Sequence, residues 1–171
     1  MKSLLTSGCV LVAMLAASCS SSTDPGKADQ AAGTVTHFSE CKRPSLAASA
    51  DSVGRDQSCL QYTYDGDSVL TLKHVNAGFN CCPDSLTATF GFMGSAITIT
   101  EAGWVGHPCD CLCLFDMDFR ITGVPPGRYT IRMTEVDLSE GAEVLQMTVN
   151  LTSAGSGQHC VTRNQYPWGQ L

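Results

Sequence analysis

The chain has 171 residues, 43% of them hydrophobic and 15% charged, which indicates a globular protein with room for one core. With 16 acidic and 10 basic residues its net charge is −6, and no basic cluster occurs, so nucleic acid is excluded as a partner. Ten cysteines are too many for an ordinary protein of a reducing compartment. Either the compartment is oxidising or thiolates hold a metal.

The amino terminus has the features of an export signal. Lys2 supplies a short positive region, and the apolar run over residues 4–17 is too short to span a bilayer. The segment Leu15-Ala16-Ala17-Ser18-Cys19 resembles the lipobox of bacterial lipoproteins, in which the cysteine becomes the lipidated first residue. This resemblance implies a signal peptide over residues 1–18 and a membrane anchor made of acyl chains on Cys19. The alternative is plain secretion with cleavage nearby.

A flexible tether is expected next. Residues 20–36 contain no periodic apolar face, so we assign 19–36 to a tether and 37–171 to a single domain. The residue after the anchor is Ser20, which is consistent with export to the outer membrane of a bacterial envelope.

The domain shows short alternating strands separated by turns. A short helix is conceivable over residues 43–53, and loops are expected over 76–80 and 102–108. The pattern predicts an all-β fold, an immunoglobulin-like or transthyretin-like antiparallel sandwich of seven to eight strands. The expected strands cover residues 59–64, 69–75, 85–92, 97–100, 109–122, 129–134 and 145–151.

The clearest alternation runs through the segment 109–122. Since successive side chains of a strand point to opposite faces, one face of this segment would be wholly apolar and the other mostly polar. We therefore expect a half-buried strand with three cysteines directed into the core. The apolar positions are Cys109, Cys111, Cys113, Phe115, Met117, Phe119 and Ile121.

Eight cysteines remain after Cys9 and Cys19 are set aside, enough for four disulfides. Cysteines two positions apart on one strand have an unfavourable geometry for a disulfide, and a disulfide between adjacent cysteines is strained. We therefore expect Cys81 and Cys82 each to reach a different member of the row formed by Cys109, Cys111 and Cys113. The third member of the row would then pair with Cys41, Cys59 or Cys160.

The alternative use of this cysteine cluster is a copper or zinc site. Thiolates are soft ligands that suit Cu(I) and Zn²⁺. Three cysteines along one strand would diverge, however, so disulfides are the preferred interpretation and no metal or other cofactor is expected. The ligands of the alternative site would be Cys81, Cys82, Cys109, Cys111, Cys113 and His107.

Other candidate residues are few. Asp110, Asp116 and Asp118 share the predicted outer face with Arg120 and are more typical of a solvated surface than of a catalytic pair. The loop with Trp104 and His107 is the best candidate ligand site, because exposed aromatic side chains on a rigid sandwich commonly bind carbohydrate or protein. The alternative is that Trp104 covers the end of the core. We find no catalytic motif and expect no enzyme.

Two resemblances accompany this interpretation. Three segments resemble a group of uncharacterised bacterial lipoproteins, from which no activity can be transferred. They are Asn80-Cys81-Cys82-Pro83, the Cys-x-Cys-Leu-Cys-x-x-Asp run at 109–116 and the Gly-x-Tyr-Thr-Ile run at 127–131. Residues 121–131 are similar to the proline-glycine corner of transthyretin-like and carboxypeptidase-regulatory-like sandwich modules. The expected function is therefore a non-catalytic binding or structural accessory module of the envelope, anchored to the membrane by its lipid.

Overall fold

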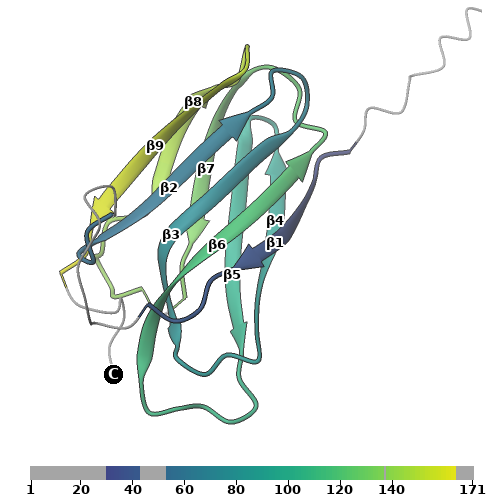
Figure 1. Ribbon diagram of the computed structural model, residues 1–171. Helices are drawn as coiled ribbons and strands as arrows, with labels where there is room; N and C mark the ends of the chain where they lie inside the picture. Colours follow the sequence, from purple (N-terminus) through teal and green to yellow (C-terminus); the bar gives the residue numbers. More distant parts are fainter. Residues whose placement is uncertain (1–29, 43–52, 137, 165–171) are drawn as a thin grey trace, which may run out of the picture.

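The computed structural model describes residues 30–42, 53–136 and 138–164, which form nine strands in two facing sheets (Figure 1). The first sheet has the order β1-β6-β3-β2-β9 and the second β4-β5-β7-β8. The predicted disulfide-stabilised β-sandwich is confirmed, with nine strands instead of seven or eight. The strands are β1 (Ala32–Phe38), β2 (Gln57–Tyr64), β3 (Leu70–Asn80), β4 (Ser85–Met93), β5 (Ala96–Trp104), β6 (Leu112–Thr122), β7 (Arg128–Thr134), β8 (Gln146–Asn150) and β9 (Gly155–Thr162).

One pair of neighbouring strands is parallel. The chain leaves β5, crosses to the other sheet as β6, and returns as β7 beside β5 in the same direction. The six other pairings are antiparallel, so the sandwich is mixed instead of wholly antiparallel. The described residues contain no helix with the length and apolar character needed to cross a bilayer.

The core lies between the sheets and is built by alternation. In β6 the inward positions Cys113, Phe115, Met117, Phe119 and Ile121 are at most 3% exposed, as the apolar register predicts. Burial of each large apolar side chain contributes about 1.5–3 kcal/mol, so this strand is a main source of stability.

Strand β6 is shorter than predicted. It begins at Leu112, so Cys109 and Cys111 lie in the preceding loop and do not point into the core. Their disulfides to the turn at Cys81 and Cys82 draw the segment out of the sheet, and Pro108 before them cannot donate a ladder hydrogen bond.

One predicted loop is strand, and the first residues of another are strand as well. Strand β3 continues through residues 76–80 because a bulge at Asn76, where φ is 68°, absorbs one residue opposite β6. Strand β5 continues to Trp104, which pairs with Ser85 at the start of β4.

The two edge strands of the first sheet were not predicted. Strand β1 includes residues assigned to the tether, and β9 follows the last expected strand, 145–151. The signal peptide, the lipidation site Cys19 and the tether up to residue 29 lie outside the described residues, as do residues 43–52 of the expected helix.

Candidate functional site

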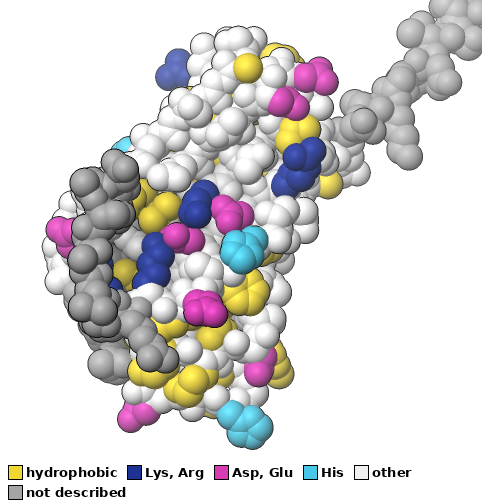
Figure 2. Space-filling view, in the orientation of Figure 1, with side chains coloured by type: hydrophobic (Ala, Val, Ile, Leu, Met, Phe, Trp, Pro, Cys, Tyr) yellow, Lys and Arg dark blue, Asp and Glu magenta, His cyan; other side chains and the backbone are white. Residues whose placement is uncertain are grey.

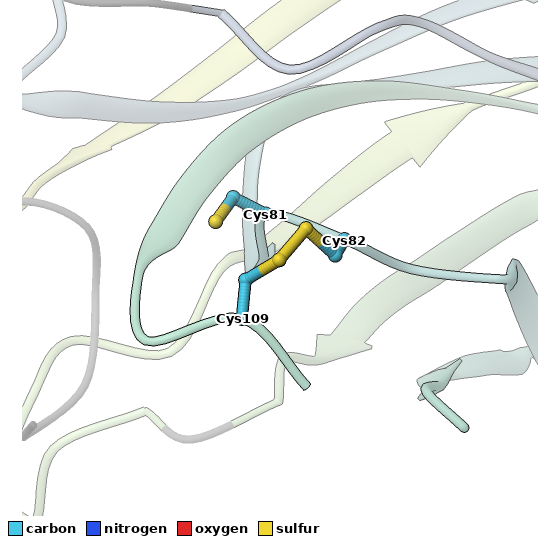
Figure 3. Close-up of side chains that lie close together, drawn as sticks. All are labelled: Cys81, Cys82 and Cys109. Carbon is cyan, nitrogen blue, oxygen red and sulfur yellow. A yellow bond between two sulfur atoms is a disulfide. The ribbon is translucent and has the colours of Figure 1, made fainter. Parts of the chain in front are cut away.

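Two disulfides bind together the loops at one end of the sandwich. The turn after β3 carries Cys81 and Cys82, and the loop before β6 carries Cys109 and Cys111. We call these four residues the clamp, with Cys81–Cys111 as its outer bridge and Cys82–Cys109 as its inner bridge. Figure 3 shows the inner bridge with the side chain of Cys81 next to it.

All four bridges agree with the pairing expected from the sequence. Cys81 and Cys82 reach different members of the cysteine row, and the third member, Cys113, pairs with Cys41. The remaining bridge joins Cys59 to Cys160, which face each other directly across β2 and β9.

The side chain of Asn80 holds the two halves of the clamp in place. Its Nδ2 donates to the carbonyl oxygen of Cys109 at 2.7 Å, and its Oδ1 accepts from the backbone N–H groups of Cys82 at 3.0 Å and Cys109 at 3.2 Å. The N–H of Cys81 donates to the carbonyl of Cys111 at 3.1 Å. The clamp is thus fixed by hydrogen bonds as well as by sulfur.

Trp104 stands beside the clamp and is 68% exposed, so it does not cover the end of the core. Its carbonyl accepts from the N–H of Asp84 at 2.9 Å, and the Asp84 carboxylate accepts from the N–H of Gly106 at 2.5 Å. A Cβ on the neighbouring Gly103 would lie 3.1 Å from the ring of Phe79, so the backbone here packs closely on the core. The indole therefore projects from a rigid base.

The residues proposed as metal ligands are not all brought together. Among the described residues, one group of three or more ligand-type side chains converges: the sulfur atoms of Cys81, Cys82 and Cys109 lie within 4.8 Å of one another. Cys113 is buried in β6 and bonded to Cys41, away from this group. His107 is exposed in the loop and is not part of the group.

The carboxylates of the outer face lie in two different places. Asp116 and Asp118 project from β6, where Asp116 pairs with Lys42 and both pair with Lys73. Figure 2 shows charged side chains of both signs on the face of the molecule formed by the five-stranded sheet. Asp110 lies in the clamp loop, before β6 begins. The three do not converge as an acid–base pair would require.

A buried polar cluster that the sequence interpretation missed joins the two sheets. His74 on β3 lies between Ser58 on β2, whose Oγ is 2.8 Å from Nε2, and Glu101 on β5, whose Oε1 is 2.7 Å from Nδ1. The Ser58 hydroxyl donates to Glu135 at 2.9 Å, and Glu135 pairs with Arg163. We call these five residues the buried cluster; each is at most 8% exposed.

Charge compensation governs the titration of the buried cluster. Burial alone would lower the pKa of His74, but the carboxylates of Glu101 and Glu135 outweigh it and raise that pKa to about 10. Burial would raise the pKa of Glu135, yet His74, Arg163 and the Ser58 hydroxyl together lower it. Burial lowers the pKa of Arg163, against the opposing effect of Glu135. The cluster is therefore an ionic network at neutral pH.

The order Ser58, His74, Glu101 is that of a nucleophile, a base and an orienting carboxylate. Ser58 and His74 are fully buried, however, and the Ser58 hydroxyl is engaged by Glu135, so a substrate cannot reach it. A signal was present in the sequence. His74 follows Leu70 and Leu72 in phase, Glu101 follows Ile97 and Ile99, and both therefore occupy inward positions.

Two hollows lie elsewhere on the described surface. One of about 460 Å³ is bordered by residues 138–143 and by Arg163, whose guanidinium is already engaged by Glu135 and the Glu143 carbonyl. The other, of about 630 Å³, lies between the edge strands β1 and β4. Neither contains Trp104 or the clamp.

Comparison with known proteins gives no relationship: no family model matches the chain, and no curated protein or solved structure is significantly similar to it.

Proposed function

We propose that this protein is a non-catalytic binding module of the bacterial envelope, lipid-anchored at Cys19, which binds its ligand with Trp104 beside the clamp. The observation that supports this proposal is the 68% exposure of Trp104 on a base fixed by two disulfides and by Asp84. An exposed indole on a rigid support loses little conformational entropy on binding, which favours recognition.

The position of the clamp suits a surface that faces away from a membrane. Ala32, at the start of β1, pairs with Thr122 at the far end of β6, whereas the clamp immediately precedes Leu112 at the near end. The 11 residues of β6 span about 36 Å at 3.3 Å per residue. A tether that ends at β1 would therefore hold the domain with Trp104 directed outward.

The preferred ligand class is carbohydrate, because a flat exposed indole stacks on a sugar face, and the exposed carboxylate of Asp110 in the clamp loop can accept hydrogen bonds from hydroxyl groups. A protein ligand is the alternative outcome. The buried cluster supports a structural role for the histidine and serine, since both are sealed from solvent.

Binding is tested on a glycan array with the purified protein, Trp104→Ala and the control Met93→Ala, whose exposed side chain lies at the opposite end of β4 from Trp104. We expect saccharide binding that falls at least tenfold in Trp104→Ala and is unchanged in Met93→Ala, with equal melting temperatures. Saccharide binding that survives Trp104→Ala would contradict the assignment of the surface. Capture of envelope proteins with no binding of saccharides would replace carbohydrate by protein as the ligand class.

Anchoring is tested separately by labelling cells with a clickable fatty acid. We expect the wild-type protein to carry the label and to be found in the outer-membrane fraction. Cys19→Ser should carry no label and should be missing from that fraction. Cys9→Ser is the matched control and should behave as wild type, because Cys9 would be removed with the signal peptide. Unlabelled wild-type protein would mean plain secretion.

A further inference from the structure

The clamp contains more covalent links than its geometry requires. The outer bridge already joins the turn after β3 to the loop before β6, and the inner bridge joins the same two segments inside it. A crosslink restricts the unfolded chain in proportion to the loop it closes, and the inner bridge closes only a small ring once the outer one exists. What the second bridge adds is two further sulfur atoms, which brings the number at this end of the sandwich to four.

The four bridges also differ in access to solvent. In the clamp, Cys82 and Cys111 are exposed and Cys81 and Cys109 half-buried. The bridges outside the clamp each contain one cysteine that is almost fully buried, at 2% exposure for Cys113 and 0% for Cys59. Since thiol–disulfide exchange requires a thiolate to approach sulfur, a reductant should open the clamp first.

The framework of the clamp does not depend on its bridges. The three hydrogen bonds of Asn80 and the one from Cys81 to Cys111 involve backbone and amide groups that reduction leaves intact. In addition, β3 and β6 remain paired up to Asn80 and Leu112. The reduced cysteines would therefore stay close together.

We propose that reduction of the clamp converts it into a four-thiolate site for a thiophilic d¹⁰ cation, Zn²⁺ or Cu⁺. A dithiol reductant gives two electrons and two protons to each bridge, yielding four thiols and two oxidised dithiols. The cation then displaces the four thiol protons. The sulfur atoms of Cys81, Cys82 and Cys109 already lie within 4.8 Å of one another, and the fourth, that of Cys111, is bonded to Cys81. A tetrahedron with metal–sulfur bonds of about 2.3 Å requires sulfur atoms about 3.8 Å apart.

Selective reduction is the first part of the test. The protein is treated with increasing dithiothreitol under native conditions, alkylated and mapped by mass spectrometry. We expect a plateau at four alkylated thiols, at Cys81, Cys82, Cys109 and Cys111, with the other two bridges intact. Simultaneous opening of all four bridges would overturn the proposal.

Metal binding is the second part. The selectively reduced protein, freed of dithiothreitol without oxygen, is titrated with Zn²⁺, with Cd²⁺ as a probe whose thiolate absorption is visible in the ultraviolet, and with Cu⁺. We expect one ion per chain, protection of four thiols from alkylation, and no binding by the oxidised or pre-alkylated protein. Comparison of the affinities for Zn²⁺ and Cu⁺ then shows which of the two cations the site prefers. Failure of all three ions to bind would overturn the site.

Variants separate the ligand set from the fold. Cys82→Ser with Cys109→Ser should lower metal affinity at least a hundredfold while the outer bridge preserves the fold under oxidising conditions. His107→Ala should leave the affinity for the metal unchanged. A loss of metal affinity in this variant would show that the ligands include histidine and are not four thiolates alone. The proposed site does not depend on ligand binding by Trp104, and Trp104→Ala should bind the metal as wild type does.

Discussion

His74 and Glu101 come from opposite sheets, and the Nδ1 atom of His74 lies 2.7 Å from the Oε1 atom of Glu101 inside the sandwich. Both side chains are within 1% of complete burial. An ion pair in such a place contributes little relative to an apolar replacement, but loss of one partner leaves an uncompensated charge. Removal of one partner should therefore destabilise the fold more than replacement of both by apolar side chains.

Alkaline pH should weaken the fold through this contact. The pKa of His74 is about 10 in the folded protein and near 6.5 when unfolded, so its contribution is complete below pH 6.5 and lost as pH rises through 10. At most about 5 kcal/mol is involved, at about 1.4 kcal/mol per pKa unit. The lowered pKa of Glu135 acts in the opposite direction, with stability lost as pH falls below about 4.5. Urea unfolding between pH 3 and 11 measures both limits.

Removal of the charge of Glu101 should reproduce this loss at neutral pH. Glu101→Gln is expected to lower the free energy of unfolding by about 2–4 kcal/mol, because protonated His74 loses its nearest countercharge. Asp118→Asn is the control, since Asp118 belongs to a looser surface pair with Lys73 at 3.9 Å, and should change stability by less than about 0.5 kcal/mol. Equal effects of the two changes would mean that the buried contact is not charged.

The sequence predicted strands where burial is one-sided. Residues 85–92 and 129–134 alternate between apolar and polar side chains, and both are strands. Strand β9 begins Gly-Ser-Gly-Gln, has little alternation and lies at an edge, so only its pairing with β2 reveals it. Strand β1 was missed for the same reason.

The site was predicted in part. The pairing of Cys81 and Cys82 followed from the geometry of a disulfide, which limits the partners of adjacent cysteines. The departure of Cys109 and Cys111 from the strand could not be predicted, because their spacing also fits the inward positions of β6. The buried cluster was missed because its members lie on separate segments with no motif spacing, although the phase of His74 along β3 and of Glu101 along β5 is inward.

Asn76 should tolerate glycine better than alanine. Its φ of 68° is costly for a residue with a Cβ, and its Nδ2 donates to the carbonyls of Gly54 at 2.9 Å and Gln57 at 2.8 Å. Asn76→Gly loses those bonds, at about 1–3 kcal/mol, and Asn76→Ala adds about 1 kcal/mol of backbone strain. The difference between the two midpoints in urea isolates the backbone contribution. Equal stability of the variants would place the whole effect in the hydrogen bonds.

The bridges should differ in their contributions to stability. Replacement of Cys59 and Cys160 by serine removes a crosslink over 101 residues and should cost about 4–5 kcal/mol. The same change at the inner bridge of the clamp should cost about 2 kcal/mol, because the outer bridge leaves a ring of about five residues to close. Thermal unfolding under oxidising conditions gives the order. A larger loss at the inner bridge would show that the clamp supports the native state in another way.

Gly33 should not accept a side chain. A Cβ there would collide with the ring of Phe90, where β1 of one sheet meets β4 of the other. Gly33→Ala is expected to cost about 1–3 kcal/mol by overpacking, with hydrogen exchange increased mainly in β1. Its exposed neighbour gives the control Thr34→Ala, which should leave exchange in β1 as in wild type.

The pairing of β2 with β9 imposes an order on biogenesis. Cys59 emerges from the ribosome 101 residues before Cys160, while Cys41 and Cys81 are already available as wrong partners. The clamp bridges close over separations of only 30 and 27 residues and can form earlier. Correct oxidation of Cys59 thus has to wait until nearly the whole domain has been synthesised. Production of this protein should therefore require a disulfide isomerase as well as the oxidase that forms its bridges.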